Sequence, residues 1–413
     1  MKLGLIGNPL GHSWSPEIHA FFLKEECYTL HEIPEEEVES FFRTTDLDGF
    51  NVTIPYKQKV IPLLDEVDPA AQKIGAVNTV VHRDGKFKGY NTDYEGFVEM
   101  VRGNGIEVNG KHVAVLGDGG VSKAVTAGIE TLGGTYDVVG ILGNPGTITY
   151  EELFEKQASY SIIVNATPVG MTPKENAAPV DLDKFEHLEA VVDVIANPLC
   201  TKLCFEAKRR GLKHCGGFEM LVRQALAADR YFTGHAMDDT AVKPCMDYLL
   251  KDRRSIVLIG MPTSGKSTIA AMIAAKTGRP LIEMDEVIES RLGTTIAECF
   301  KEHGEAYFRE VEAQLASELT ATNAVISCGG GVVKNPENMR SLSMNGLVFW
   351  IDRDIDLLFG TSSRPLSQSK EDITRLYEER KGLYQAYADV RVENNGAIED
   401  VVNEILSATG DAA

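Results

Sequence analysis

The middle of the chain reads Gly260-Met261-Pro262-Thr263-Ser264-Gly265-Lys266-Ser267, between an apolar stretch at 255–259 and a stretch of small residues that begins at Lys266. The spacing G-x-x-x-x-G-K-S, placed between a strand and a helix, is typical of a loop that binds the phosphates of a nucleoside triphosphate. Lys266 would reach the β- and γ-phosphates, and the Ser267 hydroxyl would be a ligand for Mg²⁺. An ordinary glycine-rich turn requires neither residue, so the motif predicts an ATP-binding α/β domain of the P-loop type.

Composition narrows the class of protein further. A length of 413 residues exceeds one ordinary domain, and a hydrophobic content of 43% is typical of a globular chain, so we expect two or three domains. The formal net charge of −20 argues against nucleic acid or an anionic membrane as a partner. No apolar run reaches the roughly 18 residues of a membrane span. Seven scattered cysteines without a C-x-x-C pair argue against disulfides and zinc, so we expect a cytoplasmic protein.

A second glycine-rich turn, Gly117-Asp118-Gly119-Gly120, follows an apolar stretch at 112–116. Alone it is a weak sign of a dinucleotide site, because a helix-capping turn would explain it equally well. The segments that follow alternate between strand and helix, which favours a doubly wound parallel sheet. We expect strands at 138–142, 161–166 and 190–195 and helices near 150–158 and 202–210. This part of the chain is therefore predicted to be a Rossmann-like domain.

Short polar side chains gather in the loops before that turn. Ser13 and Ser15 precede an expected helix, although a helix cap would need only Ser15. Lys57, Asn78 and Asp93 stand where strands are expected to end. Taken singly, such residues are most often turn formers or solvated edge charges. Together they supply hydroxyl, ammonium, amide and carboxylate groups, which predicts a site for a small polar ligand.

These segments resemble, in order and across residues 1 to about 250, the shikimate dehydrogenase family. The matching motifs are H-S-x-S-P at 12–16, N-V-T-x-P-Y-K at 51–57, G-A-x-N-T at 75–79, G-x-N-T-D at 89–93, N-A-T-P-V-G-M at 165–171 and G-F-E-M-L-V-R-Q at 217–224. The resemblance implies that Ser13 and Ser15 bind the carboxylate of shikimate. It implies that the ring hydroxyls are held by Thr53, Asn78, Asp93 and Gln224. Lys57 and Asp93 would be the catalytic pair, since reduction of the ketone of 3-dehydroshikimate requires a proton as well as a hydride.

The same resemblance implies NADP as the cofactor. Its contacts would come from Gly117, Gly119, Gly120, Asn144, Ala166 and Gly217. Asp118 stands where the family usually has alanine, Pro145 where NADP-dependent members have an arginine for the 2′-phosphate, and Ala196 where tyrosine is usual. A carboxylate at Asp118 would repel the pyrophosphate unless it points away or pairs with Lys123. NAD therefore stays open as the cofactor.

Residues 255–408 resemble the shikimate kinase family. After the phosphate loop, the matching segments are E-M-D-E-V-I-E at 283–289, G-E-A-Y-F-R-E-V-E at 304–312, S-C-G-G-G at 327–331, R-P-L at 364–366 and R-K-G-L-Y at 380–384. The resemblance implies that Arg309 and Arg380 bind the shikimate carboxylate and that Asp285 holds the attacking hydroxyl. The backbone would approach the ring at Gly329, Gly330 and Gly331. The predicted ATP contacts are Gly260, Ser264, Gly265, Lys266, Ser267, Thr268 and Arg364, the last on a lid. Mg²⁺ would contact Ser267 and Glu283, where glutamate replaces the family's aspartate.

Both resemblances point to shikimate, which would be the product of the dehydrogenase-like part and the substrate of the kinase-like part. We therefore expect a bifunctional enzyme that reduces 3-dehydroshikimate and phosphorylates shikimate. The expected domains are a substrate-binding domain at 1–102 with a return segment at 219–248, a nucleotide domain at 103–218 and a kinase domain at 255–408. Three alternatives stay open: a quinate dehydrogenase, a non-catalytic shikimate-binding module in the first half, and a kinase for another polyol acid or a nucleotide. The sequence predicts neither the oligomeric state nor transfer of shikimate between the halves.

Overall fold

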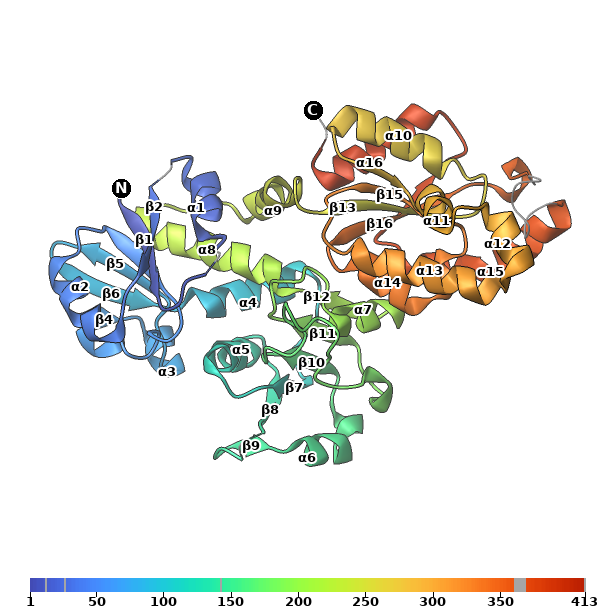
Figure 1. The fold of residues 1–413 in the computed structure, drawn as a ribbon. Coiled ribbons are helices and arrows are strands. Elements are labelled where there is room, and N and C mark those ends of the chain that lie inside the picture. Colours follow the sequence, from blue (N-terminus) through green and yellow to red (C-terminus); the bar gives the residue numbers. More distant parts are fainter. Residues whose placement is uncertain (12, 26, 142, 360–368, 412–413) are drawn as a thin grey trace. The chain divides into compact units, whose positions relative to one another are not determined.

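The computed structural model describes residues 1–11, 13–25, 27–141, 143–359 and 369–411. The chain divides into two compact units (Figure 1). The first comprises Met1–Ala207 and Leu212–Leu249, and the second comprises Leu250–Ala413 with the short segment Lys208–Gly211. Two six-stranded sheets lie in the first unit and one five-stranded sheet lies in the second, which confirms the predicted α/β class. Within the described ranges, every helix is too short or too polar to cross a membrane.

The first sheet has the strand order β2-β1-β3-β5-β6-β4. Its strands are β1 (Leu3–Gly7), β2 (Tyr28–Glu32), β3 (Gly49–Val52), β4 (Glu66–Val67), β5 (Thr79–Arg83) and β6 (Lys86–Tyr90). β1 runs parallel to β2 and β3, whereas β5 is antiparallel to β3 and β6. Because β1 and β3 run the same way, the loops that follow them open at one edge of the sheet, which is where ligands bind in such folds.

Helices supply the core on both faces of this sheet. The helices of this part of the unit are α1 (Ser15–Leu23), α2 (Val38–Thr44), α3 (Pro69–Ile74), α4 (Thr92–Gly103), α8 (Gly217–Thr233) and α9 (Val242–Leu250). Phe42 of α2 and Ala71 of α3 belong to the same core as Phe50 of β3. Phe232 of α8 belongs to a second core with Leu3 of β1. Burial from both sides explains why β1 and β3 are buried along their whole length.

The second sheet is entirely parallel, with the order β12-β11-β10-β7-β8-β9. Its strands are β7 (His112–Leu116), β8 (Thr135–Val139), β9 (Thr147–Ile148), β10 (Ile162–Asn165), β11 (Ala190–Asp193) and β12 (Lys213–Cys215), and its helices are α5 (Gly120–Thr131), α6 (Tyr150–Glu155) and α7 (Lys202–Arg209). The predicted strands and helices are present, except that β8 begins three residues before the strand predicted at 138–142 and ends at Val139. The short edge strands β9 and β12 were not predicted. The chain leaves β7 toward β8 on one side and reaches β10 on the other. A topological switch point therefore lies at the carboxyl ends of β7 and β10.

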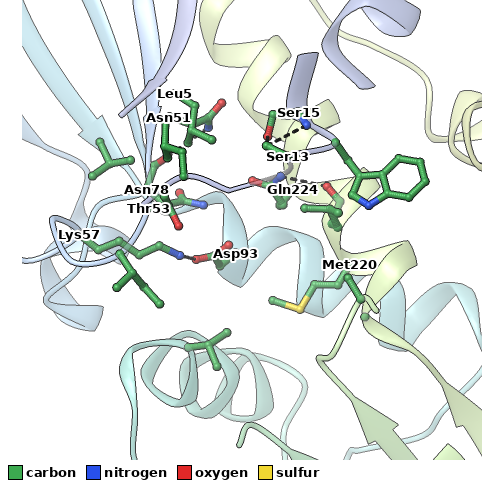
Figure 2. A pocket seen from close by; sticks show the side chains of 18 of the residues that line it. Leu5, Ser13, Ser15, Asn51, Thr53, Lys57, Asn78, Asp93, Met220 and Gln224 are labelled. Carbon is green, nitrogen blue, oxygen red and sulfur yellow. Dashed lines mark hydrogen bonds and ion pairs between the residues drawn. The ribbon is translucent and has the colours of Figure 1, made fainter. Parts of the chain in front are cut away.

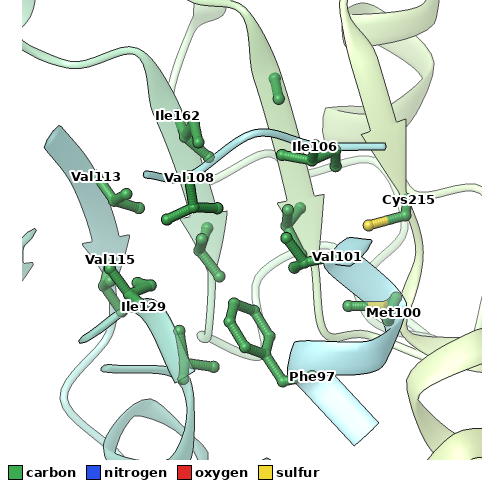
Figure 3. Packing of buried hydrophobic residues seen from close by; sticks show 14 of the residues in the cluster. Phe97, Met100, Val101, Ile106, Val108, Val113, Val115, Ile129, Ile162 and Cys215 are labelled. Carbon is green, nitrogen blue, oxygen red and sulfur yellow. The ribbon is translucent and has the colours of Figure 1, made fainter. Parts of the chain in front are cut away.

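One core of this part joins the parallel sheet to α4 (Figure 3). Phe97 and Met100 of α4 belong to the same cluster as Val113 and Val115 of β7. Gly128 allows α5 to approach α4, since a Cβ there would lie 2.6 Å from the Phe97 ring. Helix α4, which begins in a loop of the first sheet, is therefore fixed to the second.

The second unit contains a parallel sheet of order β14-β15-β13-β16-β17. Its strands are β13 (Ser255–Ile259), β14 (Leu281–Glu283), β15 (Val325–Ser327), β16 (Gly346–Asp352) and β17 (Val390–Glu393). Its helices are α10 (Lys266–Thr277), α11 (Met284–Leu292), α12 (Ile296–Glu302), α13 (Gly304–Glu318), α14 (Pro336–Ser343), α15 (Lys370–Tyr387) and α16 (Ile398–Thr409). β13 and α10 confirm the strand and helix predicted on either side of the phosphate loop. Ile269 of α10 packs in one core with Ile256 and Leu258 of β13, so the loop leaves the carboxyl end of the central strand.

Candidate functional sites

A cavity of about 570 Å³ opens in the first unit beside the loops that follow β1 and β3 (Figure 2). Eight predicted site residues line it: Ser13, Ser15, Thr53, Lys57, Asn78, Asp93, Gly217 and Gln224. Val121 of α5 and Ala196, which follows β11, also line the cavity. Both sheets of the unit therefore contribute to one site.

Lys57 and Asp93 form an ion pair in this cavity. Lys57 Nζ lies 2.7 Å from Asp93 Oδ2, and the two side chains are 25% and 15% exposed. Asp93 lies in the first turn of α4, where the helix dipole stabilises a negative charge. Asn91 caps that helix, since its side-chain oxygen accepts from Tyr94 N at 3.1 Å. The pair is partly desolvated, so its charges interact more strongly than they would on an open surface.

Tyr56 anchors the loop that carries Lys57. Its side chain is buried in the core of the first sheet, and its hydroxyl donates to the carbonyl oxygen of Ile33. The carbonyl oxygen of Lys57 accepts from Val77 N at 2.7 Å. The backbone at Lys57 is therefore fixed, while the side chain extends to Asp93 (Figure 2).

A buried hydrogen-bond network orients Asn78. Its Oδ1 accepts from Thr92 N at 2.7 Å, and its Nδ2 donates to Thr92 Oγ1 at 3.1 Å. Thr92 Oγ1 also donates to Gln224 Oε1 at 3.4 Å. Thr92 is completely buried. Sequence reasoning gave Thr92 no role, although the residue lies inside the G-x-N-T-D motif and connects two predicted site residues.

Asn51, which lines the cavity, is a second residue that sequence reasoning missed. Its Nδ2 donates to Thr79 Oγ1 at 2.9 Å, and its Oδ1 accepts from Tyr28 OH at 2.7 Å. The Tyr28 ring stacks on His19 with 4.1 Å between centroids, and His19 Nδ1 lies 2.6 Å from Asp229 Oδ1. Burial raises the pKa of Asp229, and the neighbouring His19 opposes that shift. A buried polar chain thus supports the wall of the cavity from behind.

Ser13 and Ser15 lie side by side before and at the start of α1. Ser13 Oγ donates to Ser15 Oγ at 3.2 Å and accepts from Ser15 N at 3.2 Å. Ser15 is the first residue of α1, Trp14 holds the cap position, and no side chain caps the helix. The capping interpretation of Ser15 is therefore wrong, because the helix begins at Ser15 itself. The two hydroxyls stand next to each other at the cavity, as two donors to one carboxylate require.

The glycine turn lies at the switch point, after β7. Gly117 has φ of +101°, and a Cβ there would lie 2.9 Å from Thr167 Cγ2, so only glycine fits. At Gly119 and Gly120 a Cβ would meet no atom within 4 Å, so the backbone is open there. No side chain caps α5. Its first N–H groups and the positive end of its dipole therefore fit a pyrophosphate.

Two of the remaining predicted cofactor residues, Asn144 and Ala166, lie beside this turn. Asn144 Nδ2 donates to Asp118 Oδ2 at 2.5 Å. The structure therefore pairs Asp118 with Asn144, and the contacts of the described residues include no pair between Asp118 and Lys123. The carbonyl oxygen of Ala166 lies 3.0 Å from where a Cβ of Gly117 would be. A Cβ at Gly217 would lie 2.1 Å from a backbone oxygen, so glycine is required for α8 to begin there.

In the second unit, the phosphate loop follows β13. Gly260 and Gly265 have φ of +147° and +96°, a region that favours glycine. Lys266 Nζ donates to the carbonyl oxygens of Gly260 and Met261 at 3.0 and 2.8 Å. Ser264 Oγ is buried and has no hydrogen-bond partner among the described residues. No side chain caps α10, so a loop with these donors at a helix start fits phosphate groups.

Ser267 and Glu283 lie together beside this loop. Ser267 Oγ donates to Glu283 Oε2 at 3.1 Å. Burial raises the pKa of Glu283 by more than the nearby hydroxyls of Ser327 and Ser267 lower it. Glu283 Oε1 is buried and lacks a hydrogen-bond partner in the described part of the chain. A hydroxyl beside a carboxylate with one unpaired oxygen fits Mg²⁺, which takes oxygen ligands and usually keeps several waters.

The glycine triplet brings the predicted shikimate residues of this unit together. A Cβ at Gly329 would lie 2.6 Å from Asp285 Oδ1, and a Cβ at Gly331 would lie 2.5 Å from Arg309 Nη2. The carbonyl oxygen of Gly330 accepts from Arg380 Nη1 at 2.9 Å. Side chains would therefore collide with Asp285 and Arg309 at two of the three positions.

Arg380 is buried on α15. Its Nε has no hydrogen-bond partner among the described residues. Tyr384, one turn further along the helix, donates from its hydroxyl to the carbonyl oxygen of Gly330 at 2.6 Å. A buried guanidinium with an unused donor is the arrangement expected where an anion binds.

Arg309 has partners that sequence reasoning did not assign. Its Nη1 donates to Glu312 Oε2 at 2.9 Å, and its Nε and Nη2 donate to Glu305 Oε1 at 3.1 and 2.9 Å. Burial raises the pKa of Glu312, and Arg309 opposes that shift. Asn338 Nδ2 lies 3.3 Å from Glu312 Oε2. The spacing of three and four residues along one helix could have indicated both carboxylates.

Two predicted ATP residues remain. Thr268 is exposed in the first turn of α10. Arg364 lies outside the described residues. Sequence reasoning also missed Asn394, which directly follows β17. Its Nδ2 donates to the carbonyl oxygen of Ser264 at 2.7 Å and so holds the phosphate loop in place.

Each unit has a glycine-rich loop suited to the phosphates of a nucleotide, together with a group of polar side chains suited to a small substrate. A doubly wound sheet with a Lys–Asp pair beside its glycine turn defines the class of nicotinamide-dependent oxidoreductases. A P-loop beside an acidic residue and two arginines defines the class of small-molecule kinases.

Comparisons with known proteins identify the family within each class. A family profile described as "Shikimate dehydrogenase substrate binding domain" matches residues 5–80, and one described as "Shikimate kinase" matches residues 262–409. A protein named "Shikimate dehydrogenase (NADP(+))" from Clostridium beijerinckii is 39% identical over 256 residues, which cover 57% of this chain and 93% of the relative. The chain therefore belongs to the shikimate dehydrogenase family, and it carries a shikimate kinase domain in its second unit.

Solved structures show the same likeness for the first unit. A chorismate mutase/shikimate 5-dehydrogenase fusion protein from Clostridium acetobutylicum is 35% identical with a TM-score of 0.56, covering 60% of this chain and 96% of that one. Shikimate 5-dehydrogenase from Thermus thermophilus, in complex with NADP(H) and shikimate, is 34% identical with a TM-score of 0.54, covering 59% and 98%. The resemblance of the first half to shikimate dehydrogenase is thus confirmed by sequence and by fold.

Proposed function

We propose that the first unit reduces 3-dehydroshikimate to shikimate and oxidises a reduced nicotinamide dinucleotide. We propose that the second unit converts shikimate and Mg-ATP to shikimate 3-phosphate and ADP. The Lys57–Asp93 pair, at 2.7 Å in a cavity that α5 also reaches through Val121, carries the first assignment. The buried Arg380, with an unused Nε beside the glycine triplet, carries the second. NADP, which is named for the relatives, and NAD both fit the open glycine turn.

In the first unit, Lys57 and Asp93 would handle the proton. The bound dinucleotide would supply hydride to the ring carbon of the ketone. Lys57 Nζ would donate a proton to the ketone oxygen as negative charge develops there, and Asp93 would hold Nζ in position. Thr53, Asn78 and Gln224 would bind ring hydroxyls and so place the ketone at Nζ.

The shikimate carboxylate would bind to Ser13 and Ser15. Their hydroxyl oxygens lie 3.2 Å apart, which suits one donor to each carboxylate oxygen. Lys57 is the only lysine or arginine among the described residues that line the cavity. Neutral donors at the carboxylate therefore leave that single cation for the reacting oxygen.

In the second unit, ATP would supply the phosphoryl group, and Mg²⁺ would be held by Ser267 Oγ and Glu283. Lys266 would exchange the carbonyl oxygens that it now contacts for phosphate oxygens. The residue that binds the attacking hydroxyl would be Asp285. Since phosphoryl transfer depends mainly on positioning and charge neutralisation, these contacts account for most of the chemistry.

Arg380 and Arg309 would bind the carboxylate of shikimate in this unit. A buried donor without a partner costs about 1–3 kcal/mol, and a carboxylate at Arg380 Nε would recover that free energy. Arg309 is held by Glu305 and Glu312, which fixes the direction of its guanidinium. Planar forked donors suit carboxylate better than an ammonium group would.

A single reaction mixture tests both assignments. The full chain with 3-dehydroshikimate, NADPH or NADH, and Mg-ATP should form shikimate 3-phosphate. Lys266→Ala should accumulate shikimate, and Lys57→Ala should leave 3-dehydroshikimate unchanged while still phosphorylating added shikimate. If no dinucleotide binds and no shikimate is oxidised, the first unit is a non-catalytic shikimate-binding module instead. A faster rate with quinate than with shikimate would make it a quinate dehydrogenase.

A further inference from the structure

The carboxylate of Asp118 lies over the end of β8. Its Oδ2 accepts from Asn144 Nδ2 at 2.5 Å. A Cβ at Gly140, the residue after β8, would lie 3.1 Å from the same oxygen. The side chain therefore leaves the glycine turn and reaches the neighbouring strand, and it does not cap the start of α5.

Asn144 is itself held in a tight turn. Its carbonyl oxygen accepts from Thr147 N at 3.0 Å and from Thr147 Oγ1 at 2.7 Å. Thr147 begins β9, which pairs with β8. The amide that contacts Asp118 is therefore fixed to the sheet, and the carboxylate has a defined position.

In this type of fold, the adenosine ribose of a dinucleotide is recognised at the carboxyl end of the strand that corresponds to β8. When a pyrophosphate lies at the glycine turn, the ribose reaches the end of the next strand. An acidic side chain there accepts from the 2′-hydroxyl of NAD, whereas an arginine accommodates the 2′-phosphate of NADP. Residues 140–147 contain no lysine or arginine, and Ile141 is 82% exposed and offers an apolar face for the adenine ring.

We propose that Asp118, held by Asn144, is the residue that selects the cofactor: its carboxylate accepts from the ribose 2′-hydroxyl and repels a 2′-phosphate. The proposal rests on the proposed dehydrogenase function, and it makes this chain bind NAD(H) at least as tightly as NADP(H). The acid comes from the glycine turn itself, one residue after Gly117, and not from the strand end. A search for an acidic residue directly after β8 would miss it.

The test is equilibrium binding of NAD⁺ and NADP⁺ to the full chain by calorimetry, with excess ADP to occupy the phosphate loop of the second unit. Asp118→Ala should tighten NADP⁺ by at least about tenfold and weaken NAD⁺ by about fivefold or more, because the hydrogen bond from the ribose 2′-hydroxyl to the carboxylate is lost. Asp118→Asn, which removes the charge and keeps an amide-sized side chain, should also tighten NADP⁺. Glu186→Gln removes one charge before β11, at the opposite ends of the strands, and should leave both affinities unchanged.

Salt gives an independent readout, because charge repulsion is screened by salt. The ratio of the NADP⁺ to the NAD⁺ dissociation constant should fall as ionic strength rises in the parent, and stay nearly constant in Asp118→Ala. If the parent binds NADP⁺ at least tenfold more tightly than NAD⁺ and neither Asp118 variant changes that ratio, the proposal is wrong while the dehydrogenase assignment stands. If the parent binds neither dinucleotide, both are wrong.

Discussion

Replacing Lys57 by alanine removes the only ammonium or guanidinium group among the described residues that line the first cavity. No second cation there can take over proton donation, so the full contribution of a general acid, about 10²- to 10⁴-fold in rate, should be lost. That range corresponds to about 3–5.5 kcal/mol of transition-state stabilisation. The KM for shikimate should change by less than about tenfold, because Ser13, Ser15 and Asn78 keep their contacts.

The assay is dehydrogenase turnover followed by NAD(P)H absorbance, with shikimate phosphorylation by the same sample as a measure of correct folding. Lys59→Ala is the matched control: Lys59 lies two residues further on, is 45% exposed and pairs with Glu35, away from the cavity. A surface pair of this kind is worth about 0–1 kcal/mol, so turnover should match the parent. If Lys57→Ala retains turnover within threefold of the parent, Lys57 does not donate the proton.

Three further predictions concern the other sites. Arg309→Ala and Arg380→Ala should each lower kcat/KM for shikimate in the kinase assay by about thirtyfold or more and leave the KM for ATP unchanged. The reason is that losing one partner of a desolvated ion pair costs about 2–5 kcal/mol. Unchanged shikimate affinity in both variants would mean that the kinase has another substrate. Lys266→Ala should abolish phosphoryl transfer and leave shikimate oxidation at the parental rate, and a loss of both would indicate misfolding. Burial raises the pKa of Asp193 to about 6 from its ordinary 3.8, against hydrogen bonds from Thr201, Ile195 and Asn165. The folded state then binds the extra proton, so the free energy of unfolding of the parent should fall relative to Asp193→Asn by about 2.4 kcal/mol between pH 4 and pH 7. A pH-independent difference in denaturant melts would contradict this.

Sequence reasoning found the residues that lie inside short contiguous motifs. Lys57 follows β3 and Asp93 follows β6, whereas Asn78 directly precedes β5 and does not stand at the end of a strand as predicted. The fold places all three in one cavity. Asp285, in the first turn of α11, and Arg309, on α13, both lie beside the glycine triplet. Local spacing predicts which loop carries a group, and the parallel order of strands then brings the loops together.

Other missed residues, Thr92, Asn51 and Asn394, act through partners distant in the sequence, unlike Glu305 and Glu312, which are within one helical turn of Arg309. Thr92 joins Asn78 to Gln224, which lies on a helix that the chain reaches only after the second sheet. Lys123, in the helix after the glycine turn, was considered as the partner of Asp118, but the structure pairs Asp118 with Asn144, which follows the next strand. Such pairs depend on strand register and loop path, and a linear pattern contains neither.

Helix α8 determines when one face of β1 can be buried during synthesis. Leu3 and Leu5 of β1 share their core with Ala228 and Phe232, at the end of α8. A growing chain therefore exposes one face of its first sheet until the whole nucleotide-type sheet has been made. The kinase core, by contrast, draws on Ile256 to Leu406 alone and can close without waiting for any earlier segment. The long sequence separation in the first unit makes it the slower part to fold and the one that depends longer on protection from aggregation.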